Sequence, residues 1–110
     1  ELSLSSKRKV LVRFNEDSSG NSYRVDANTK PASNAWTHVA ATYDGSTIKI
    51  YINGTLEASR NANFQLASNT LDLYLGSGND GYRPYSGGLD DIRVYDRALT
   101  ADEVQQLSTP

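Results

Sequence analysis

The sequence predicts an all-β domain of antiparallel strands, followed by one short helix at its C-terminal end. Short runs of alternating apolar and polar residues recur along the chain, and turn dipeptides ending in glycine separate several of them. A strong helix-start signal occurs near residue 100. The chain has 110 residues, of which 37% are hydrophobic, enough to bury one core. We therefore expect residues 1–110 to form a single domain.

Two strands are predicted in the N-terminal quarter of the chain, over residues 10–14 and 23–25. Each segment places apolar side chains at every second position, the period of a half-buried antiparallel strand. The apolar positions are Val10, Val12, Phe14, Tyr23 and Val25.

A three-stranded meander is predicted next. Residues 37–43 and 47–52 should pair through Asp44-Gly45, because this dipeptide favours the positive backbone angles of a type I′ hairpin turn. Asn53-Gly54 repeats that turn chemistry and should start a third strand through Leu56 and Ala58. In the middle strand, the core side is expected to carry the isoleucines Ile48, Ile50 and Ile52.

Two further strands are predicted in the last third of the chain. Leu71, Leu73 and Leu75 alternate with polar or aromatic residues. In the final strand Ile92 and Val94 share one face, whereas Leu89 falls on the opposite one. A β-bulge at Asp90-Asp91 would return Leu89 to the core, and bulges often lie beside functional sites.

A short helix should end the chain. Thr100 can cap it and Glu103 at the third position completes a capping box, while Leu99 can pack against Val104. The helix has only about two turns, so Val104 and Leu107 must dock on the sheet to keep it folded.

Composition narrows the class of partner. The net charge is −2 and the pI about 5.2, which argues against nucleic acid as a partner. Lys7, Arg8 and Lys9 form the one dense basic cluster, together with Arg13. We interpret this cluster as a solvated strand end, and contact with an anionic glycan or partner is the alternative.

The absence of cysteine excludes disulfides and thiolate metal sites. No apolar run is long enough to span a bilayer and no signal peptide opens the chain, so membrane insertion is not expected and any export signal lies outside this segment.

Three motifs in order resemble the laminin G-like jelly rolls of the concanavalin A-like lectin and glucanase superfamily. They are Trp-Thr-His-Val-Ala-Ala-Thr-Tyr-Asp-Gly at 36–45, Ile-Lys-Ile-Tyr-Ile-Asn-Gly at 48–54, and Gly-Leu-Asp-Asp-Ile-Arg-Val-Tyr at 88–95 with the Arg-Ala-Leu-Thr tail at 97–100. The resemblance covers roughly residues 9–107. It implies an antiparallel two-sheet β-sandwich in a secreted or cell-surface protein, often binding carbohydrate or protein and often holding calcium.

The resemblance has one departure. Domains of this family usually begin with several strands before the point at which Glu1 stands, so about a third of the usual roll has no counterpart here. A sandwich without those strands exposes sheet edges, which template pairing with another chain. We therefore expect the gap to be filled by a neighbouring chain or by a rearranged sheet.

Calcium is the cofactor that the resemblance implies. Asp90 matches the acidic residue that often binds a structural calcium at the head of the last strand in this superfamily, and calcium prefers several oxygen ligands. In the alternative interpretation, the carboxylates of Asp90 and Asp91 accept backbone hydrogen bonds at the bulge or pair with Arg93.

The loop over residues 76–88 is the candidate ligand site. Sugars present apolar ring faces edged by hydroxyl groups, so their sites combine aromatic side chains with planar hydrogen-bonding groups. The loop supplies both kinds, in Asn79, Asp80, Tyr82, Arg83 and Tyr85. A plain connection between strands is the alternative, and Asn79 and Asp80 could also hold calcium.

Several other conspicuous residues are interpreted as structural. Trp36 should pack at a sheet edge, and His38, the single histidine, lacks the partners of a triad or a multi-histidine metal site. Asn53-Gly54-Thr55 has the form of a glycosylation acceptor, but the hairpin turn explains it without modification.

Catalysis is not expected. Glycan-cleaving enzymes of the retaining class place paired carboxylates about 5 Å apart. The glutamates of this chain are instead well separated in sequence, at Glu1, Glu16, Glu57 and Glu103.

Two hypotheses about function remain. The first is an extracellular or cell-surface recognition module that binds carbohydrate with the help of calcium. The second is a structural or adhesive subunit that assembles with neighbouring chains through open sheet edges, as an oligomer or fibre.

Overall fold

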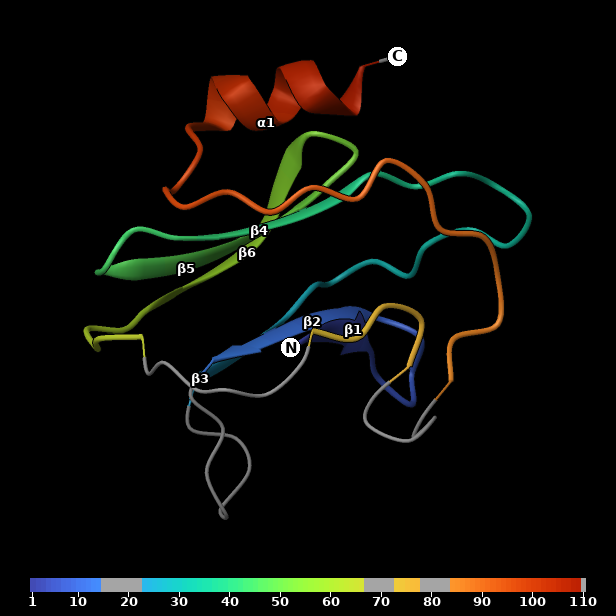
Figure 1. Cartoon of the computed structure of the whole chain (residues 1–110), viewed down its shortest axis with the longest axis horizontal. Helices are drawn as coiled ribbons and strands as arrows, with labels where there is room; N and C mark the ends of the chain where they lie inside the picture. Colours follow the sequence, from blue (N-terminus) through green and yellow to red (C-terminus); the bar gives the residue numbers. More distant parts are fainter. Residues whose placement is uncertain (15–22, 67–72, 78–83, 110) are drawn as a thin grey trace. The chain divides into compact units, whose positions relative to one another are not determined.

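The computed structural model describes residues 1–14, 23–66, 73–77 and 84–109 (Figure 1). The chain divides into two compact units, one made of residues 1–66 with 97–110 and the other of residues 67–96. Within the described residues, the first unit holds every strand and the single helix. The fold is mostly β, with two antiparallel three-stranded sheets and one short C-terminal helix, as predicted.

The first sheet has the strand order β1-β2-β3. β1 (Leu2–Leu4), β2 (Val10–Phe14) and β3 (Tyr23–Asp26) pair antiparallel, with Val12 opposite both Leu2 and Val25. The strands predicted at 10–14 and 23–25 are therefore confirmed. β1 was not predicted, because three residues are too short a run for a clear alternating pattern.

The second sheet is the predicted meander. β4 (Val39–Tyr43), β5 (Thr47–Ile52) and β6 (Thr55–Asn61) pair in sequence order, with a register shift opposite Ile50 and Tyr51. The β5–β6 turn has the expected form, since Asn53 and Gly54 both have positive φ, at 50° and 81°.

The β4–β5 turn differs from the prediction. Three residues connect the strands, and among them only Gly45 has a positive φ, at 95°, so the turn is not type I′. Instead the Asp44 carboxylate Oδ1 accepts hydrogen bonds from the amides of Ser46, at 2.9 Å, and Thr47, at 2.8 Å. Aspartate often stabilises a turn in this way, because its carboxylate accepts hydrogen bonds from backbone amides that follow it in the chain.

The two sheets share one hydrophobic core. Alternate positions of β2 and β3 meet alternate positions of β5, as the period of two requires. Its buried members are Val10, Val12, Val25, Ala27, Ile48 and Ile50. The isoleucine face of β5 is thus confirmed as the core face, with Ile48 and Ile50 fully buried and Ile52 packed at the core's margin.

An aromatic cluster lies at the margin of this core. The ring of Phe64 stacks on Tyr43 at 4.2 Å and on Tyr23 at 4.1 Å between centroids, with Phe14 beside them. The Tyr43 hydroxyl also donates a hydrogen bond of 2.5 Å to the Phe64 carbonyl. The cluster joins β2, β3, β4 and the segment after β6.

The helix α1 (Ala101–Ser108) begins with the predicted capping box. The Thr100 hydroxyl accepts from the Glu103 amide, and the Glu103 carboxylate accepts from the Thr100 amide at 2.9 Å. Val104 is fully buried and Leu107 half-buried, which is the expected docking. Figure 1 shows α1 alongside the second sheet, on the side away from the first.

Four further predictions about local structure are wrong. Residues 73–75 and 89–95 form no strand, and no ladder includes Asp90-Asp91, so there is no bulge there; Leu71 and Asp72 lie outside the described residues. An alternating pattern needs a neighbouring strand to satisfy its backbone groups, and within the described residues none pairs with these segments. Trp36 is 74% exposed rather than packed at an edge, and it lies three positions before the first residue of β4, outside the β4–β5 ladder.

Candidate recognition surfaces

The predicted ligand loop is described only at its two ends. Asn79, Asp80, Tyr82 and Arg83 lie outside the described residues, so their roles stay predictions. Tyr85 is described and is 43% exposed, which leaves part of its ring open to a ligand. One of the five predicted ligand-binding residues can therefore be placed.

A short hydrogen bond closes the base of this loop. The Tyr85 amide donates to the Gly76 carbonyl at 2.6 Å, which brings the two ends of the segment 76–85 together. The Tyr85 side chain folds back over Gly87, where an added Cβ would stand 2.6 Å from the tyrosine hydroxyl oxygen. Tyr85 is thus positioned by its own backbone bond and by the absence of a side chain at Gly87.

The predicted metal ligand Asp90 is exposed and accepts a local hydrogen bond. Its Oδ1 atom accepts from the Asp91 amide at 2.8 Å. Asp91 has a φ of 53° and pairs with Arg93, whose Nε lies 2.9 Å from Oδ1. Hydrogen bonds to the side chains of Tyr95 and then Asp91 raise the pKa of Arg93. These contacts match the alternative interpretation of the acidic pair, and Asp90 as a calcium ligand stays a prediction.

The described residues hold no ready-made metal-binding cluster. In the part of the chain that the structure describes, no three histidine, cysteine or carboxylate side chains come together. A calcium site at Asp90 would therefore draw its other ligands from backbone carbonyls, water or residues beyond those described.

His38 serves the second sheet through its backbone. Its amide donates to the Asn53 side-chain oxygen at 2.9 Å, and its carbonyl accepts from the Asn53 amide at 2.8 Å. The Nδ1 atom is buried, and no hydrogen-bond partner reaches it from the described residues. This backbone pairing supports the structural interpretation of His38.

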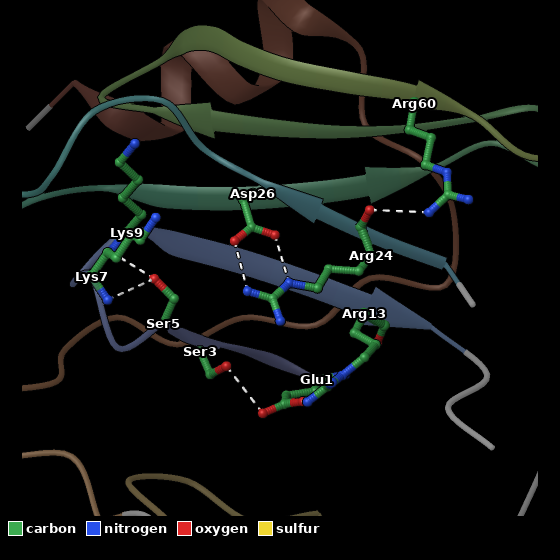
Figure 2. A network of polar contacts seen from close by, with 9 residues as sticks. All are labelled: Glu1, Ser3, Ser5, Lys7, Lys9, Arg13, Arg24, Asp26 and Arg60. Carbon is green, nitrogen blue, oxygen red and sulfur yellow. Dashed lines mark hydrogen bonds and ion pairs between the residues drawn. The ribbon is translucent and has the colours of Figure 1, made fainter. Parts of the chain in front are cut away.

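A network of polar side chains covers one face of the first sheet (Figure 2). Arg13 on β2 pairs with the Glu1 carboxylate, which also accepts from the Ser3 hydroxyl at 3.0 Å. On β3, Arg24 donates two hydrogen bonds to Asp26, at 2.6 and 2.8 Å. All of these residues occupy alternate positions opposite in parity to the core residues, so they face away from the second sheet.

The turn between β1 and β2 borders this face and holds the basic cluster. Ser5 organises the turn: its carbonyl accepts from the Arg8 amide at 2.8 Å, and its hydroxyl oxygen accepts from the Lys7 and Lys9 amides at 3.3 Å each. Arg8 adopts a left-handed conformation with a φ of 60°. The cluster interpreted as a solvated strand end is therefore a defined turn.

The charges on this face influence one another. Hydrogen bonds from Arg24 lower the pKa of Asp26, and the nearby charges of Arg24, Lys9 and Arg13 lower it further. Partial burial alone would raise the pKa of Glu1, but hydrogen bonds from Arg13 and Ser3 outweigh it and lower that pKa. Both carboxylates therefore stay ionised near neutral pH and neutralise the arginines that they contact.

Sequence reasoning found the basic cluster but missed the ion pairs beside it. Arg24 and Asp26 are two positions apart on a strand, which places both on one face, so this pair could have been read from the spacing. Glu1 and Arg13 meet only because β1 and β2 pair, and β1 was not predicted.

Comparisons with known proteins place this geometry in context. Residues 1–105 match the laminin G-type family model described as the concanavalin A-like lectin/glucanases superfamily. The human adhesion G-protein coupled receptor D1 is 32% identical over 94 residues, which cover 81% of this chain and 11% of the receptor. The chain therefore spans about a tenth of that relative's length.

A solved structure has a similar fold. The S-layer domain-containing protein from Clostridium thermocellum ATCC 27405, in its residues 221–444, superimposes with a TM-score of 0.61 and 28% sequence identity. The match covers 92% of this chain and 52% of that structure.

Among the described residues, no helix has the length and apolar character needed to cross a membrane.

Proposed function

Because the chain belongs to the concanavalin A-like lectin/glucanases superfamily, as the match over residues 1–105 shows, we propose that it is a non-catalytic recognition module of an extracellular or cell-surface protein. The observation that carries this proposal is the pair of similar proteins, an adhesion receptor and an S-layer domain-containing protein. The names of both proteins refer to the cell surface, and the shared domain type supports a common adhesive role.

Carbohydrate is the ligand that we propose for this module, with calcium as a structural aid. Tyr85 supports the choice, because its partly exposed ring is held in place by the bond to Gly76 and could pack against the apolar face of a sugar. Asp90 would contribute one carboxylate oxygen to calcium.

A glycan array measured in calcium and again in EDTA tests this proposal. We expect binding in calcium that falls in EDTA, and binding that weakens in the Tyr85→Ala variant. Asp90→Asn is the matched variant for the metal, because asparagine keeps an oxygen that can accept from the Asp91 amide but removes the charge. Calcium-dependent binding that survives Asp90→Asn unchanged would remove Asp90 from the metal site, and no binding in either buffer would contradict the lectin-like role.

Assembly through sheet edges is the second candidate function, and β1 favours it. Leu2 and Leu4 stand opposite Val12 and Val10, so they lie on the core face of the first sheet. The two valines are 3% exposed, whereas Leu2 and Leu4 are 52% and 44% exposed. β1 is an edge strand of its sheet, and an edge with exposed apolar side chains is a template for strand pairing.

Sedimentation velocity across protein concentration tests the assembly role. We expect a rise in sedimentation coefficient with concentration, which the Leu2→Lys/Leu4→Lys variant removes, because lysine on an edge opposes pairing. A monomer at every concentration would contradict assembly between copies of this chain.

A further inference from the structure

Backbone hydrogen bonds fix which side of β1 faces β2. Glu1 and Arg13 exchange two of these bonds, of 2.7 and 2.8 Å. At the other end of β1, the Ser5 amide donates to the Lys9 carbonyl at 2.8 Å. Because bonded and non-bonded positions alternate along an antiparallel ladder, the odd-numbered residues of this segment, Ser3 included, direct their backbone groups towards β2.

The even-numbered residues therefore place their backbone groups on the outer edge of the sheet. The N–H and C=O groups of Leu2 and Leu4 point away from β2, and within the described residues no strand lies on that side of β1. In the same part of the chain, no backbone group bonds to them. An edge with unpaired backbone groups and exposed leucines can accept another strand.

The residues of β1 read the same in both directions. Its sequence is Leu2-Ser3-Leu4, with a leucine on each side of a central serine. A twofold axis through Ser3 would place Leu2 of one copy opposite Leu4 of the other, and the reverse. Each of these leucine pairs brings free N–H and C=O groups together and can exchange two hydrogen bonds. The outer edge of β1 is thus complementary to itself.

The charges at the two ends of β1 favour the antiparallel direction. Figure 2 shows Glu1 at one end of this strand, and Lys7 and Lys9 at the other. A parallel pair would bring the basic turns of both copies together, where like charges repel. In an antiparallel pair, each basic turn lies instead beside the end of the other copy that holds Glu1, which is the complementary arrangement.

Pairing would also cover apolar surface. Leu2 and Leu4 stand opposite Val12 and Val10, so both leucines lie on the core face of the first sheet, where they remain exposed. Opposite residues of paired strands point to the same face, so the leucines of the two copies would contact each other across the axis. The exposed area of these side chains would therefore fall on association.

We propose that two copies of this chain form a twofold dimer in which their β1 strands pair antiparallel about Ser3. The first sheets of both copies then join into one continuous sheet with the order β3-β2-β1-β1-β2-β3. The inference rests on the assembly role proposed above and deepens it: the partner is a second copy, and the contact closes as a dimer because it uses the same edge of both copies. Three-residue strands bury little area, so the dimer should be weak and form at high protein concentration.

Disulfide trapping tests the position of the axis, because the sequence has no cysteine. The two Ser3 residues would form a non-hydrogen-bonded pair, whose Cα atoms lie about 4.5 Å apart, within the range that a disulfide bridges. Ser3→Cys should therefore form a covalent dimer under mild oxidation. Ser59→Cys is the matched control, because Ser59 is an exposed serine on β6, an edge strand of the second sheet. At about 0.1 mM protein, Ser3→Cys should crosslink about 10-fold faster than the control, because paired thiols have effective concentrations in the mM range.

Amide hydrogen exchange of the parent chain tests the hydrogen bonds themselves. The Leu4 amide should exchange more slowly as the protein concentration rises, because only the dimer gives it an acceptor. The Ser3 amide already faces β2 and should change less. Sedimentation velocity should show an increase that stops at the mass of a dimer.

Failure of this dimer and failure of the assembly role give different results. If the parent associates but Ser3→Cys crosslinks no faster than Ser59→Cys, the proposed axis is wrong while the assembly role stands. Growth beyond a dimer would likewise overturn the closed contact. Equal protection of the Leu4 amide at every concentration would show that another segment of the same chain covers the edge. A monomer at every concentration would contradict the assembly role itself.

Discussion

Glycine is required at both hairpin turns of the second sheet, but for different reasons. Gly45 and Gly54 have φ values of 95° and 81°, a region that side chains with a Cβ rarely adopt. A Cβ on Gly45 would have no atom within 4 Å. A Cβ on Gly54 would collide with the Ser108 side chain and stand 3.2 Å from the Gln105 Cα atom, because α1 packs directly on this turn. Gly45 is needed only for its left-handed backbone conformation, whereas Gly54 is needed both for that conformation and for the close approach of α1.

Alanine at each position separates these two effects. Gly45→Ala should lower the free energy of unfolding by about 1–2 kcal/mol, the cost of the left-handed conformation alone. Gly54→Ala should lower it by a further 1–3 kcal/mol or so, because the backbone of α1 must move. Urea unfolding at constant m-value measures both. Equal losses would show that α1 does not rest on the β5–β6 turn.

At the scale of the element, α1 depends on side chains at its first turn. An eight-residue helix is too short to be stable alone, so capping and the burial of Val104 must hold it. Arg97 extends the capping box, since its Nη1 and Nη2 lie 2.8 and 2.5 Å from the two Glu103 oxygens. The Arg97 hydrogen bonds, followed by the Thr100 amide, lower the pKa of Glu103 from 4.5 to about 2.

This shifted pKa makes the stability of α1 depend on pH in a defined direction. Because the carboxylate is favoured in the folded chain, its contribution is complete above the unfolded pKa of 4.5 and is lost as the pH falls towards 2. Between pH 5 and pH 2, the parent should therefore lose more stability than Glu103→Gln, which keeps an oxygen for the Thr100 amide but cannot ionise. Urea titrations of both proteins across that range measure the difference, and parallel curves would contradict the assignment.

The N-cap gives a second, pH-independent test. Thr100→Ala removes the acceptor for the Glu103 amide and should destabilise the chain by about 1 kcal/mol, the usual loss at this position. Thr100→Ser keeps the hydroxyl and should cost much less, as both residues are favoured N-caps. Helix content by circular dichroism and urea midpoints report the two variants, and an equal effect of both would argue against the cap.

Elements could be predicted from the sequence when the residues that stabilise them lie close together in the chain. The β4–β5–β6 meander and the capped helix depend on neighbours within a few residues, such as Asn53-Gly54 or Thr100 with Glu103, so local patterns identified them. Residues 73–75 and 92–94 also alternate, but they lack a pairing strand among the described residues, and a local pattern cannot show that a partner strand is missing. The same distinction holds for the sites: the basic turn was visible as a run of residues, whereas the Glu1–Arg13 pair required the β1–β2 register.

At the scale of the whole molecule, both sheets depend on one layer of side chains. Val10, Val12 and Val25 from the first sheet pack with Ile48 and Ile50 from the second, and Arg60 on β6 donates to the Arg24 carbonyl on β3 at 3.2 Å. Neither sheet could bury these residues alone, because a three-stranded sheet buries its apolar face only against a second layer. The polar face with its basic turn is therefore positioned by the core behind it.

Truncation of this layer should weaken both sheets together. Ile50→Ala removes a fully buried side chain and should lower the free energy of unfolding by about 2–5 kcal/mol. Val94→Ala is the control: Val94 is 79% exposed, so its truncation should change stability by no more than about 0.5 kcal/mol. Amide hydrogen exchange would show whether the loss is shared, because in a single cooperative core Ile50→Ala lowers protection in β2 as well as β5. Loss confined to β4–β6 would mean that the two sheets unfold independently, and a large loss from Val94→Ala would mean that residues 89–95 are packed in solution as the strand their alternating pattern predicts.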